Sequence, residues 1–232
     1  MKGFDKLPST NEYIKEHVHE MHNFDSVYTS NQTEGRGRNG HTWVSEPGRN
    51  AAFSILIKES HIVARYNLVS IITAIAVSNY LENIGMPNVQ LKWPNDVLVD
   101  GKKICGILLE GKLPEYIILG VGINVNQMKF EGFEATSIKN VLDLKVQPSL
   151  VAADIETLIL DYISDVGDNL EEYIDEYNDK DYLLDKNISF TYQGKNLEGT
   201  AKGINLDGSL KVECNGEIIN INSDEVKIIR TK

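Results

Sequence analysis

One helical stretch between runs of β-branched residues limits what this chain can fold into. From about Tyr66 to Ile84, apolar residues recur at helical spacing until Gly85 and Pro87 end the pattern. These apolar positions are Leu68, Ile71, Ile72, Ile75 and Leu81. Runs typical of strands occur on both sides, at 51–57, 97–99, 104–109 and 116–125. We therefore expect this helix to pack on a central sheet.

Two further helices are indicated on either side of this region. Ser9, Thr10 and Asn11 offer capping side chains ahead of a helical face formed by Ile14, Val18 and Met21. A longer helix is predicted from about Leu150 to Tyr177, with an apolar stripe. The stripe comprises Ile155, Leu158, Ile159, Tyr162 and Ile163. The acidic stretch 161–181 is interpreted as the solvated face of that helix.

The last 45 or so residues change character and predict a small all-β module. From Ile188 onward, short strand-like runs alternate with the turn pairs Gln193-Gly194, Asp207-Gly208 and Asn215-Gly216. A β-barrel of SH3-like size fits this length. We expect an α/β (α+β) chain with a first domain at 1–184, in which helices flank a mixed sheet, and a C-terminal β domain at 185–232.

Charge and cysteine content exclude several classes of protein. The 23 Lys and Arg against 34 Asp and Glu give a net charge of −11, which argues against a broad DNA-binding surface. Cys105 and Cys214 lack the spacing of a metal site and the density of a disulfide scaffold. No leader or membrane-spanning stretch is recognisable. We expect a soluble, cytoplasmic protein without a membrane or DNA partner.

Two chemistry-bearing segments stand out. In the first, residues 32–43 concentrate Gly35, Gly37, Gly40, Arg36 and Arg38 within a few positions of an acidic chain. Glycines let backbone approach an anion and guanidinium groups bind phosphate or carboxylate, although a flexible surface loop has the same composition. The second segment, 92–110, reads as strand, turn, strand and would hold charged side chains rigidly, although a plain hairpin fits equally.

A third segment, Gly120 to Asn126, is a strand interrupted by two glycines. Glycine inside a strand often marks the close approach of a ligand or of another backbone. Taken in order, the segments resemble the biotin protein ligase family. The matching motifs are Ser9 to Asn11, Gln32 to Arg38, Lys92 to Asp96, Lys103 to Leu108 and Gly120 to Asn124. The C-terminal β segment matches that family's small terminal domain.

The resemblance implies a catalytic domain of the class II aminoacyl-tRNA-synthetase type and a biotin site. It assigns polar contacts with the ureido ring of biotin to Ser9, Thr10, Asn11 and Gln32, although Ser9 and Thr10 also suit a helix cap. The rest of the implied biotin set is Gly35, Arg36, Gly37, Arg38, Lys103 and Gly106.

It also implies that ATP activates biotin to biotinyl-5'-AMP and that biotin then passes to a lysine of a biotin carboxyl carrier protein. Catalytic roles fall to Arg36, Arg38, Lys103 and Asp96, with Mg²⁺ offsetting phosphate charge. Asp96 would orient the acceptor amine or accept its proton, with a metal or structural role as alternatives. Nucleotide contacts are expected from Arg38, Trp43, Lys92, Asn95, Lys103 and Asn124. Core packing is the alternative for Trp43, as for Trp93, and hairpin capping for Asn124.

The chain departs from the family at Asn39 and His41, where relatives often carry arginines. It also shows no helix-turn-helix segment ahead of Ser9, so we expect no operator binding. The rival interpretations are a lipoate or octanoate transferase, whose Arg-Arg-x-x-Gly-Gly-Gly loop is missing, and a non-catalytic biotin sensor. A homodimer formed through an edge strand near Gly120 to Asn126 is a hypothesis.

Overall fold

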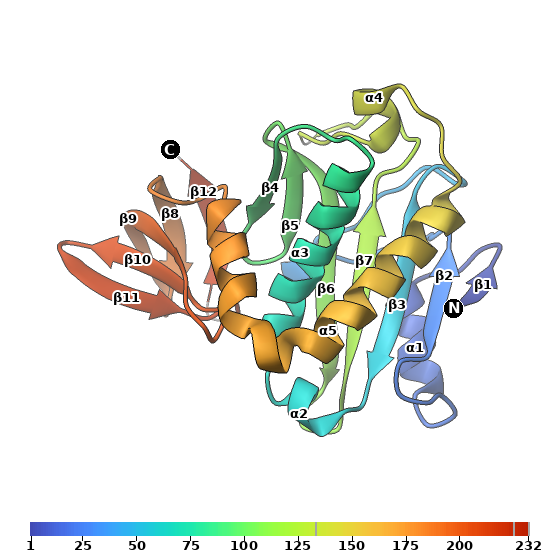
Figure 1. Ribbon diagram of the computed structural model, residues 1–232, viewed down its shortest axis with the longest axis horizontal. Coiled ribbons are helices and arrows are strands. Elements are labelled where there is room, and N and C mark those ends of the chain that lie inside the picture. Colours follow the sequence, from blue (N-terminus) through green and yellow to red (C-terminus); the bar gives the residue numbers. More distant parts are fainter. Residues whose placement is uncertain (133, 225, 232) are drawn as a thin grey trace.

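Two β-sheets organise the molecule, and a long helix connects them (Figure 1). The computed structural model describes residues 1–132, 134–224 and 226–231. Within those residues the first sheet has seven strands, in the order β1-β2-β3-β7-β6-β5-β4. These strands are β1 (Lys2–Phe4), β2 (Ser26–Thr29), β3 (Ala51–Ile57), β4 (Val89–Lys92), β5 (Asp96–Val99), β6 (Lys102–Lys112) and β7 (Tyr116–Ile123). This is the mixed sheet that the sequence predicts, since β1 pairs parallel with β2 and the other neighbours pair antiparallel.

The position of β7 corrects the expected dimer edge. Every residue of β7 from Ile117 to Ile123 pairs with β3, and the strand pairs along its length with β6 on the other side. A strand with both neighbours in place has no free backbone groups for a second copy of the chain. The expected free edge at Gly120 to Ile123 is therefore wrong, and a homodimer stays a hypothesis.

The two faces of β3 and β7 carry different kinds of side chain. Phe53, Ile55 and Leu119 point into the large core beneath α3 (Tyr66–Asn83) and α5 (Pro148–Asp179). Leu56 and Ile118 point to the opposite face, where they pack with Ile14 of α1 (Thr10–His17). Small residues continue that second face toward the other end of the strands, and α1 does not fill the space above them.

The helix α3 is buried on all sides rather than on one face. Its residues from Leu68 to Ser78 are all buried. The sheet covers one side and α5 covers the other, as Figure 1 shows, with α5 crossing in front of α3. A helix that is apolar all round belongs in such a central position. The sequence correctly predicted the helix and its contact with the sheet, but gave no sign of the second cover.

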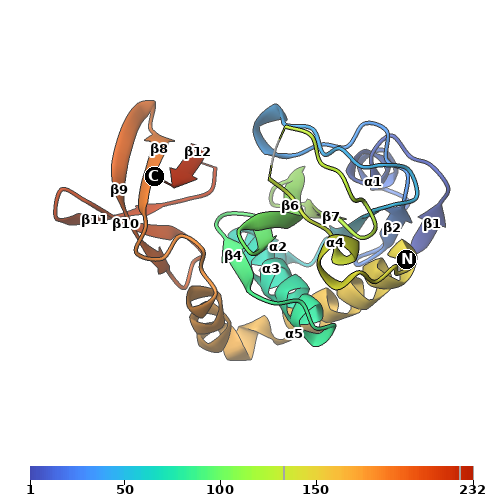
Figure 2. The ribbon, with the colours of Figure 1, turned by 90° about the horizontal axis from the view of Figure 1, so that it is seen from above.

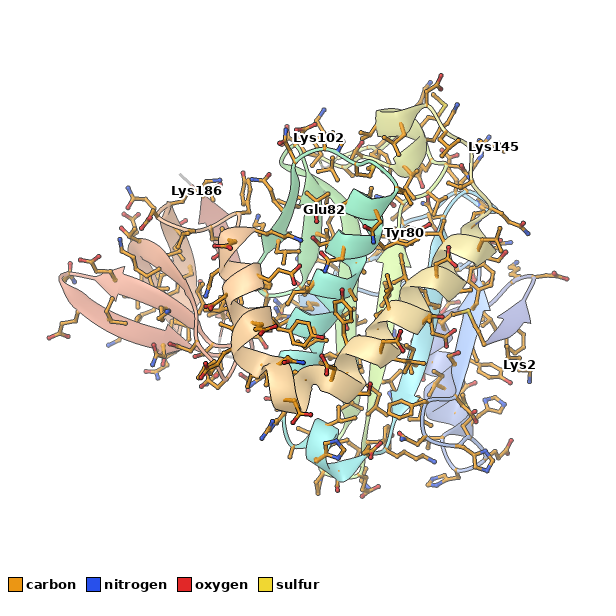
Figure 3. The ribbon with its side chains drawn as sticks, in the orientation of Figure 1. Lys2, Tyr80, Glu82, Lys102, Lys145 and Lys186 are labelled. Carbon is orange, nitrogen blue, oxygen red and sulfur yellow. The ribbon has the colours of Figure 1, made fainter. Side chains whose placement is uncertain are left out.

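The helix α5 runs from the first sheet toward the second, with a break in helical geometry at Asn169. Exposed acidic residues follow its outer face, as expected for 161–181. Beyond its end, Lys180 donates to Glu82 and Glu176 at 2.9 and 3.0 Å, and also to Ser78 and Asn79. Figure 3 shows Glu82 projecting from α3 toward this junction. The Lys180 ammonium thus joins α3 to the end of α5.

The second sheet stands beside the first and is antiparallel throughout (Figure 2). Its five strands, within the described residues, follow the order β11-β10-β9-β8-β12. They are β8 (Asn187–Tyr192), β9 (Lys195–Ile204), β10 (Leu210–Cys214), β11 (Glu217–Ile221) and β12 (Val226–Thr231). Positive φ values at Gln193-Gly194 and Asn215-Gly216 confirm both pairs as hairpin turns.

The remaining elements are short. They are α2 (Ser60–Val63), α4 (Ile138–Leu142) and the 3₁₀ turn η1 (Arg38–Gly40) within the glycine- and arginine-rich loop. In the described part of the chain, we find no helix long and apolar enough to cross a membrane.

Candidate functional site

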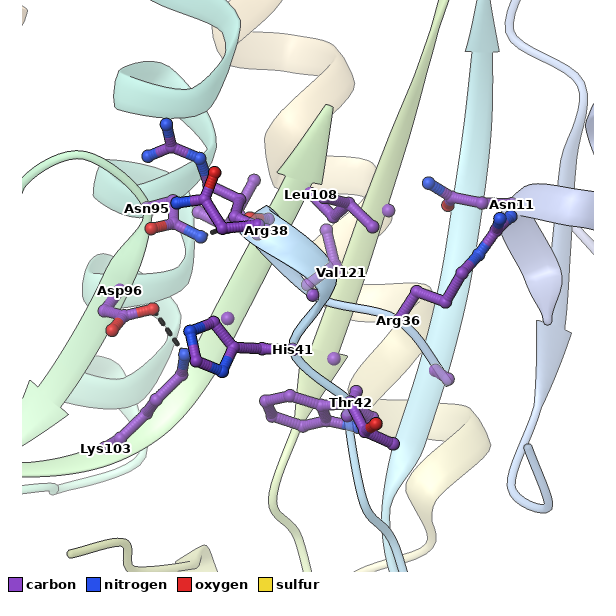
Figure 4. Close-up of a pocket in the computed structure, with 18 of the residues that line it drawn as sticks. Asn11, Arg36, Arg38, His41, Thr42, Asn95, Asp96, Lys103, Leu108 and Val121 are labelled. Atoms are coloured by element: carbon purple, nitrogen blue, oxygen red, sulfur yellow. Dashed lines mark hydrogen bonds and ion pairs between the residues drawn. The ribbon is translucent and has the colours of Figure 1, made fainter. Parts of the chain in front are cut away.

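A cavity of about 320 Å³ lies above the small residues of β3, β6 and β7 (Figure 4). The loop 32–43, which we call the Gly-Arg loop, covers it, and α1, the turn 93–95 and Val226 of the second sheet complete its walls. Most of the residues singled out from the sequence line it. They are Ser9, Thr10, Asn11, Gln32, Arg36, Gly37, Arg38, Trp43, Lys92, Asn95, Asp96, Lys103 and Gly106.

One end of the cavity presents neutral hydrogen-bonding groups. Ser54 Oγ on β3 lies 2.7 Å from Thr10 Oγ1 and 2.6 Å from Asn11 Oδ1. Gln32 Oε1 accepts from the backbone N–H of Thr10 at 2.9 Å. Ser9 caps α1, because its hydroxyl accepts from the Glu12 N–H at 3.4 Å, and it also lines the cavity. The capping and pocket-lining interpretations of Ser9 are thus geometrically compatible.

The other end presents charged groups. Lys103 Nζ and Asp96 Oδ1 lie 2.5 Å apart on the neighbouring strands β6 and β5. Figure 4 shows this ion pair on the opposite side of the pocket from Asn11. Because β5 and β6 are held by ladder hydrogen bonds, the ammonium and the carboxylate are fixed without either residue being fully buried.

Arg38 joins the charged end to the second sheet. Its Nη2 donates to the carbonyl oxygen of Ser223, in the segment before β12. Burial lowers the pKa of the Arg38 guanidinium, while the nearby charges of Asp96 and Asp224 act in the opposite direction. Trp93 adds a second link, since its Nε1 donates to Gly208 O at 3.0 Å in the buried interface. The second sheet therefore contributes to the position of a site residue.

Glycines form the floor of the cavity because other side chains need the space. A Cβ atom on Gly122 would lie 2.5 Å from Trp43 Cε2, and one on Gly106 would lie 3.1 Å from Trp43 Cζ3. The indole of Trp43 lies over these strands, with Lys103 Nζ 5.8 Å from its ring centre. Its Nε1 has no hydrogen-bond partner among the described residues. Trp43 thus lines the site, and Trp93 borders the same cavity while being buried in the core.

Arg36 lies away from the other predicted catalytic residues. Its Nη2 bonds to Glu12 of α1 and lies 3.7 Å from Glu110 Oε2 on β6. Figure 4 shows its side chain extending toward Asn11 and not toward Lys103. The structure therefore groups Lys103, Asp96 and Arg38, and leaves Arg36 at the other end of the cavity, beside Asn11.

Several other candidates have structural partners. Asn95 Nδ2 donates to Ile107 O at 2.7 Å, and Lys92 Nζ lies 5.8 Å from the Tyr182 ring centre. Asn124 is buried, donates its backbone N–H to Ile104 O at 2.9 Å, and lies outside the lining of the cavity. Gly35 also lies outside the lining, and a Cβ there would meet Trp43 O at 2.4 Å.

Sequence reasoning did not single out Ser54, Glu110, Ser223 or Asp224. Ser54 is the polar residue within an otherwise apolar strand, which is a signal that could have been used. Glu110 is the last residue of the charged segment 92–110 and lies outside the motifs that match the family. Ser223 and Asp224 reach the site only because the second sheet folds back beside the turn 93–95, which no local pattern reveals.

Comparisons with known proteins agree with this geometry. The sequence model of the biotin/lipoate A/B protein ligase family matches residues 3–126, more than half of the chain, and that of the biotin protein ligase C-terminal domain matches residues 183–227. The bifunctional ligase/repressor BirA of Escherichia coli is 29% identical over 174 residues, covering 73% of this chain and 53% of that protein. A Mycobacterium tuberculosis biotin–[acetyl-CoA-carboxylase] ligase is 36% identical over 125 residues, covering 52% and 46%.

The matched segments thus span about half the length of these curated relatives. Among solved structures, the biotin protein ligase of Aquifex aeolicus in complex with biotin and ATP superposes with a TM-score of 0.89, at 25% identity. That superposition covers 99% of this chain and 98% of the Aquifex chain. The chain belongs to the biotin/lipoate A/B protein ligase family.

Proposed function

We propose that this protein is an ATP-dependent biotin ligase that makes biotinyl-5'-AMP and transfers biotin to a lysine of a carrier protein. The observation that carries the proposal is a single cavity with neutral hydrogen-bonding groups at one end and Lys103, Asp96 and Arg38 at the other. Biotin has the matching polarity, since a neutral ureido ring and a carboxylate stand at opposite ends of an apolar molecule.

In the first step, the Lys103 ammonium and the Arg38 guanidinium offset repulsion between the biotin carboxylate and the α-phosphate of ATP. A carboxylate oxygen attacks the α-phosphorus, the bond to the β-phosphate oxygen breaks, and pyrophosphate leaves. Trp43 offers an aromatic surface beside the charged end, which suits a nucleotide, and its Nε1 has no hydrogen-bond partner among the described residues. Lys92 and Asn95 border the same end of the cavity.

In the second step, the amine of the acceptor lysine attacks the biotinyl carbonyl and AMP leaves. A free lysine is mostly protonated at neutral pH, so the attacking nitrogen must lose a proton. Asp96 lies beside the reacting end, and its carboxylate is held by Lys103 at 2.5 Å. Once the Lys103 charge is engaged by the substrate phosphate, the Asp96 carboxylate is free to orient the amine and accept its proton.

Mg²⁺ fits this site as an ion carried by the nucleotide. The described residues contain no group of three or more His, Cys, Asp or Glu side chains arranged to hold a metal. Mg²⁺ needs only one or two protein carboxylates when substrate phosphates supply other ligands, and Asp96, which lines the cavity, would be one. When bound, the ion would neutralise developing charge on the phosphates.

Three finer expectations belong to the same proposal. The acceptor would be a biotin carboxyl carrier protein or domain, as the names of the related ligases suggest. The catalytic domain would comprise residues 1–184 and the β domain 185–232, and the protein would act in the cytoplasm. The match of residues 183–227 to a domain named for biotin ligases favours biotin over lipoate or octanoate.

The decisive test is transfer of labelled biotin to a purified carrier domain with ATP and Mg²⁺, using wild type, Lys103→Ala and Arg38→Ala. We expect transfer by the wild type, and losses of about 100-fold or more in each variant because each removes a cation from the phosphate. Biotin-dependent exchange of pyrophosphate into ATP isolates the first step. Biotin binding without any pyrophosphate exchange would favour a non-catalytic sensor instead.

A further inference from the structure

Resting on the proposed function, we infer that Glu110 is a positioning residue that couples closure of the Gly-Arg loop to the ureido end of the biotin pocket. Two different groups at the ureido end of the pocket contact its carboxylate. One belongs to α1 and the other to the loop, so a single side chain of β6 holds both walls of the pocket together.

The first contact fixes the orientation of the Asn11 amide. Asn11 Nδ2 donates to Glu110 Oε2 at 2.8 Å, while Asn11 Oδ1 accepts from Ser54 Oγ at 2.6 Å. With a carboxylate on one side and a hydroxyl donor on the other, the amide has a single favourable orientation. A ureido ring presents both donors and an acceptor, so its recognition depends on which way this amide faces.

The second contact holds the Gly-Arg loop. Arg36 Nη2 lies 3.7 Å from Glu110 Oε2 and also bonds to Glu12. Figure 4 shows Arg36 crossing from the loop toward Asn11. The guanidinium therefore links the loop to α1 and β6 and lies away from the reacting groups at Lys103. We call this contact of Arg36 with Glu12 and Glu110 the latch.

The arrangement predicts how biotin binding and closure of the Gly-Arg loop depend on each other. When Arg36 moves away from Glu110, the carboxylate keeps only its hydrogen bond with Asn11. When Glu110 loses its charge, the latch weakens and the amide of Asn11 becomes free to rotate. Side chains of Arg36 and Glu110 are 42% and 32% exposed, so the latch can open without burying an unpaired charge. Biotin capture and loop closure should therefore respond together to substitution at Glu110.

The experiment compares Glu110→Gln with Glu115→Gln, which removes a carboxylate paired with Lys112 on the exposed β6–β7 turn. Biotin affinity and dissociation rate are measured by calorimetry and stopped flow, and kcat by pyrophosphate exchange at saturating biotin. For Glu110→Gln we expect the Kd and KM for biotin to rise about tenfold, with kcat within about twofold, because the binding end and not the reacting end is altered. Glu115→Gln should match the wild type.

A double-mutant cycle with Arg36→Met tests the coupling itself. The effects of Arg36→Met and Glu110→Gln on biotin affinity should be less than additive, and Arg36→Lys should retain more affinity than Arg36→Met. Unchanged affinity in Glu110→Gln, strict additivity, or a fall in kcat at constant KM would overturn the inference. Because Kd and dissociation are read without ATP, these outcomes are distinct from failure of the proposed ligase activity, which the exchange assay of the wild type reports.

Discussion

At the scale of single residues, the pocket depends on the absence of side chains as much as on their presence. The glycines on β6 and β7 leave room for Asn11 and Trp43, and Gly120 is the most confined, since an added Cβ would lie 2.3 Å from Asn11 Oδ1. Asn11 cannot easily give way, because Ser54 and Glu110 hold both ends of its amide. Interruption of the strand by glycine, noted from the sequence, thus has a steric cause.

Gly120→Ala should therefore weaken both biotin binding and folding. We expect a rise in the Kd for biotin of about tenfold or more and a loss of about 1–3 kcal/mol in the free energy of unfolding, because the Asn11 amide must shift. Calorimetric titration and urea unfolding measure the two effects. Gly3→Ala is the control, since its Cβ would lie 4.0 Å from its nearest neighbour. Equal biotin affinity in both variants would contradict the steric account.

At the scale of elements, α3 and α5 show what a periodic pattern can and cannot tell. Both helices were predicted close to their observed bounds, Tyr66–Asn83 and Pro148–Asp179. The pattern in α5 is amphipathic and leads directly to one buried face, whereas α3 is apolar on all sides and needs two covers. Only the packing of α5 across α3 supplies the second cover.

Gly167 in α5 offers a test of helix propensity within this layer. It lies inside the helix, just before the break at Asn169, and a Cβ built on it has no neighbour within 4 Å. Gly167→Ala should stabilise the protein by about 0.5–1 kcal/mol, since alanine reduces the entropy of the unfolded chain without a steric cost. Urea or thermal unfolding measures the gain. A destabilised variant would show that the break at Asn169 requires the glycine.

At the scale of the whole molecule, the two sheets share one hydrophobic core. The same cluster of buried residues contains Phe53 of the first sheet, Tyr177 of α5, Leu183 of the connecting segment and Phe190 of the second sheet. Polar contacts reinforce it through Trp93 and Arg38. We therefore expect the two parts to unfold together.

The junction between them also makes stability depend on pH through Asp181. Burial raises the pKa of this carboxyl to about 6, and its Oδ2 has no hydrogen-bond partner among the described residues. Between its ordinary pKa and about 6, the folded state binds more protons than the unfolded state, so the stability contribution of Asp181 falls as pH rises through this window. The full loss is about 2–3 kcal/mol at 1.36 kcal/mol per pKa unit.

Asp181→Asn should remove this dependence. The difference in free energy of unfolding, variant minus wild type, should rise by about 2–3 kcal/mol between pH 4 and pH 7. The asparagine carbonyl can still accept from Leu183 N–H, as Asp181 Oδ1 does at 2.8 Å. Urea unfolding at several pH values gives the difference, and a difference that stays constant with pH would exclude Asp181 as its source.

The sequence alone indicated the local elements and most of the residues that line the cavity. Helices at α3 and α5 and the hairpin turn at Asn215-Gly216 follow from short-range patterns, because periodicity and turn preference depend on neighbouring residues. The family resemblance singled out Lys103, Asp96 and Asn11, which line one cavity in the structure. The family resemblance supplied the biotin and ATP chemistry.

Only the tertiary structure decided which of these residues act together. It placed β7 inside the sheet and not at its edge, turned Arg36 toward Glu12 and Glu110, and brought Ser223 to Arg38 across 185 positions of the chain. Such contacts depend on strand order and on the packing of one sheet beside another. Those are properties of long-range pairing, which a local sequence pattern does not encode.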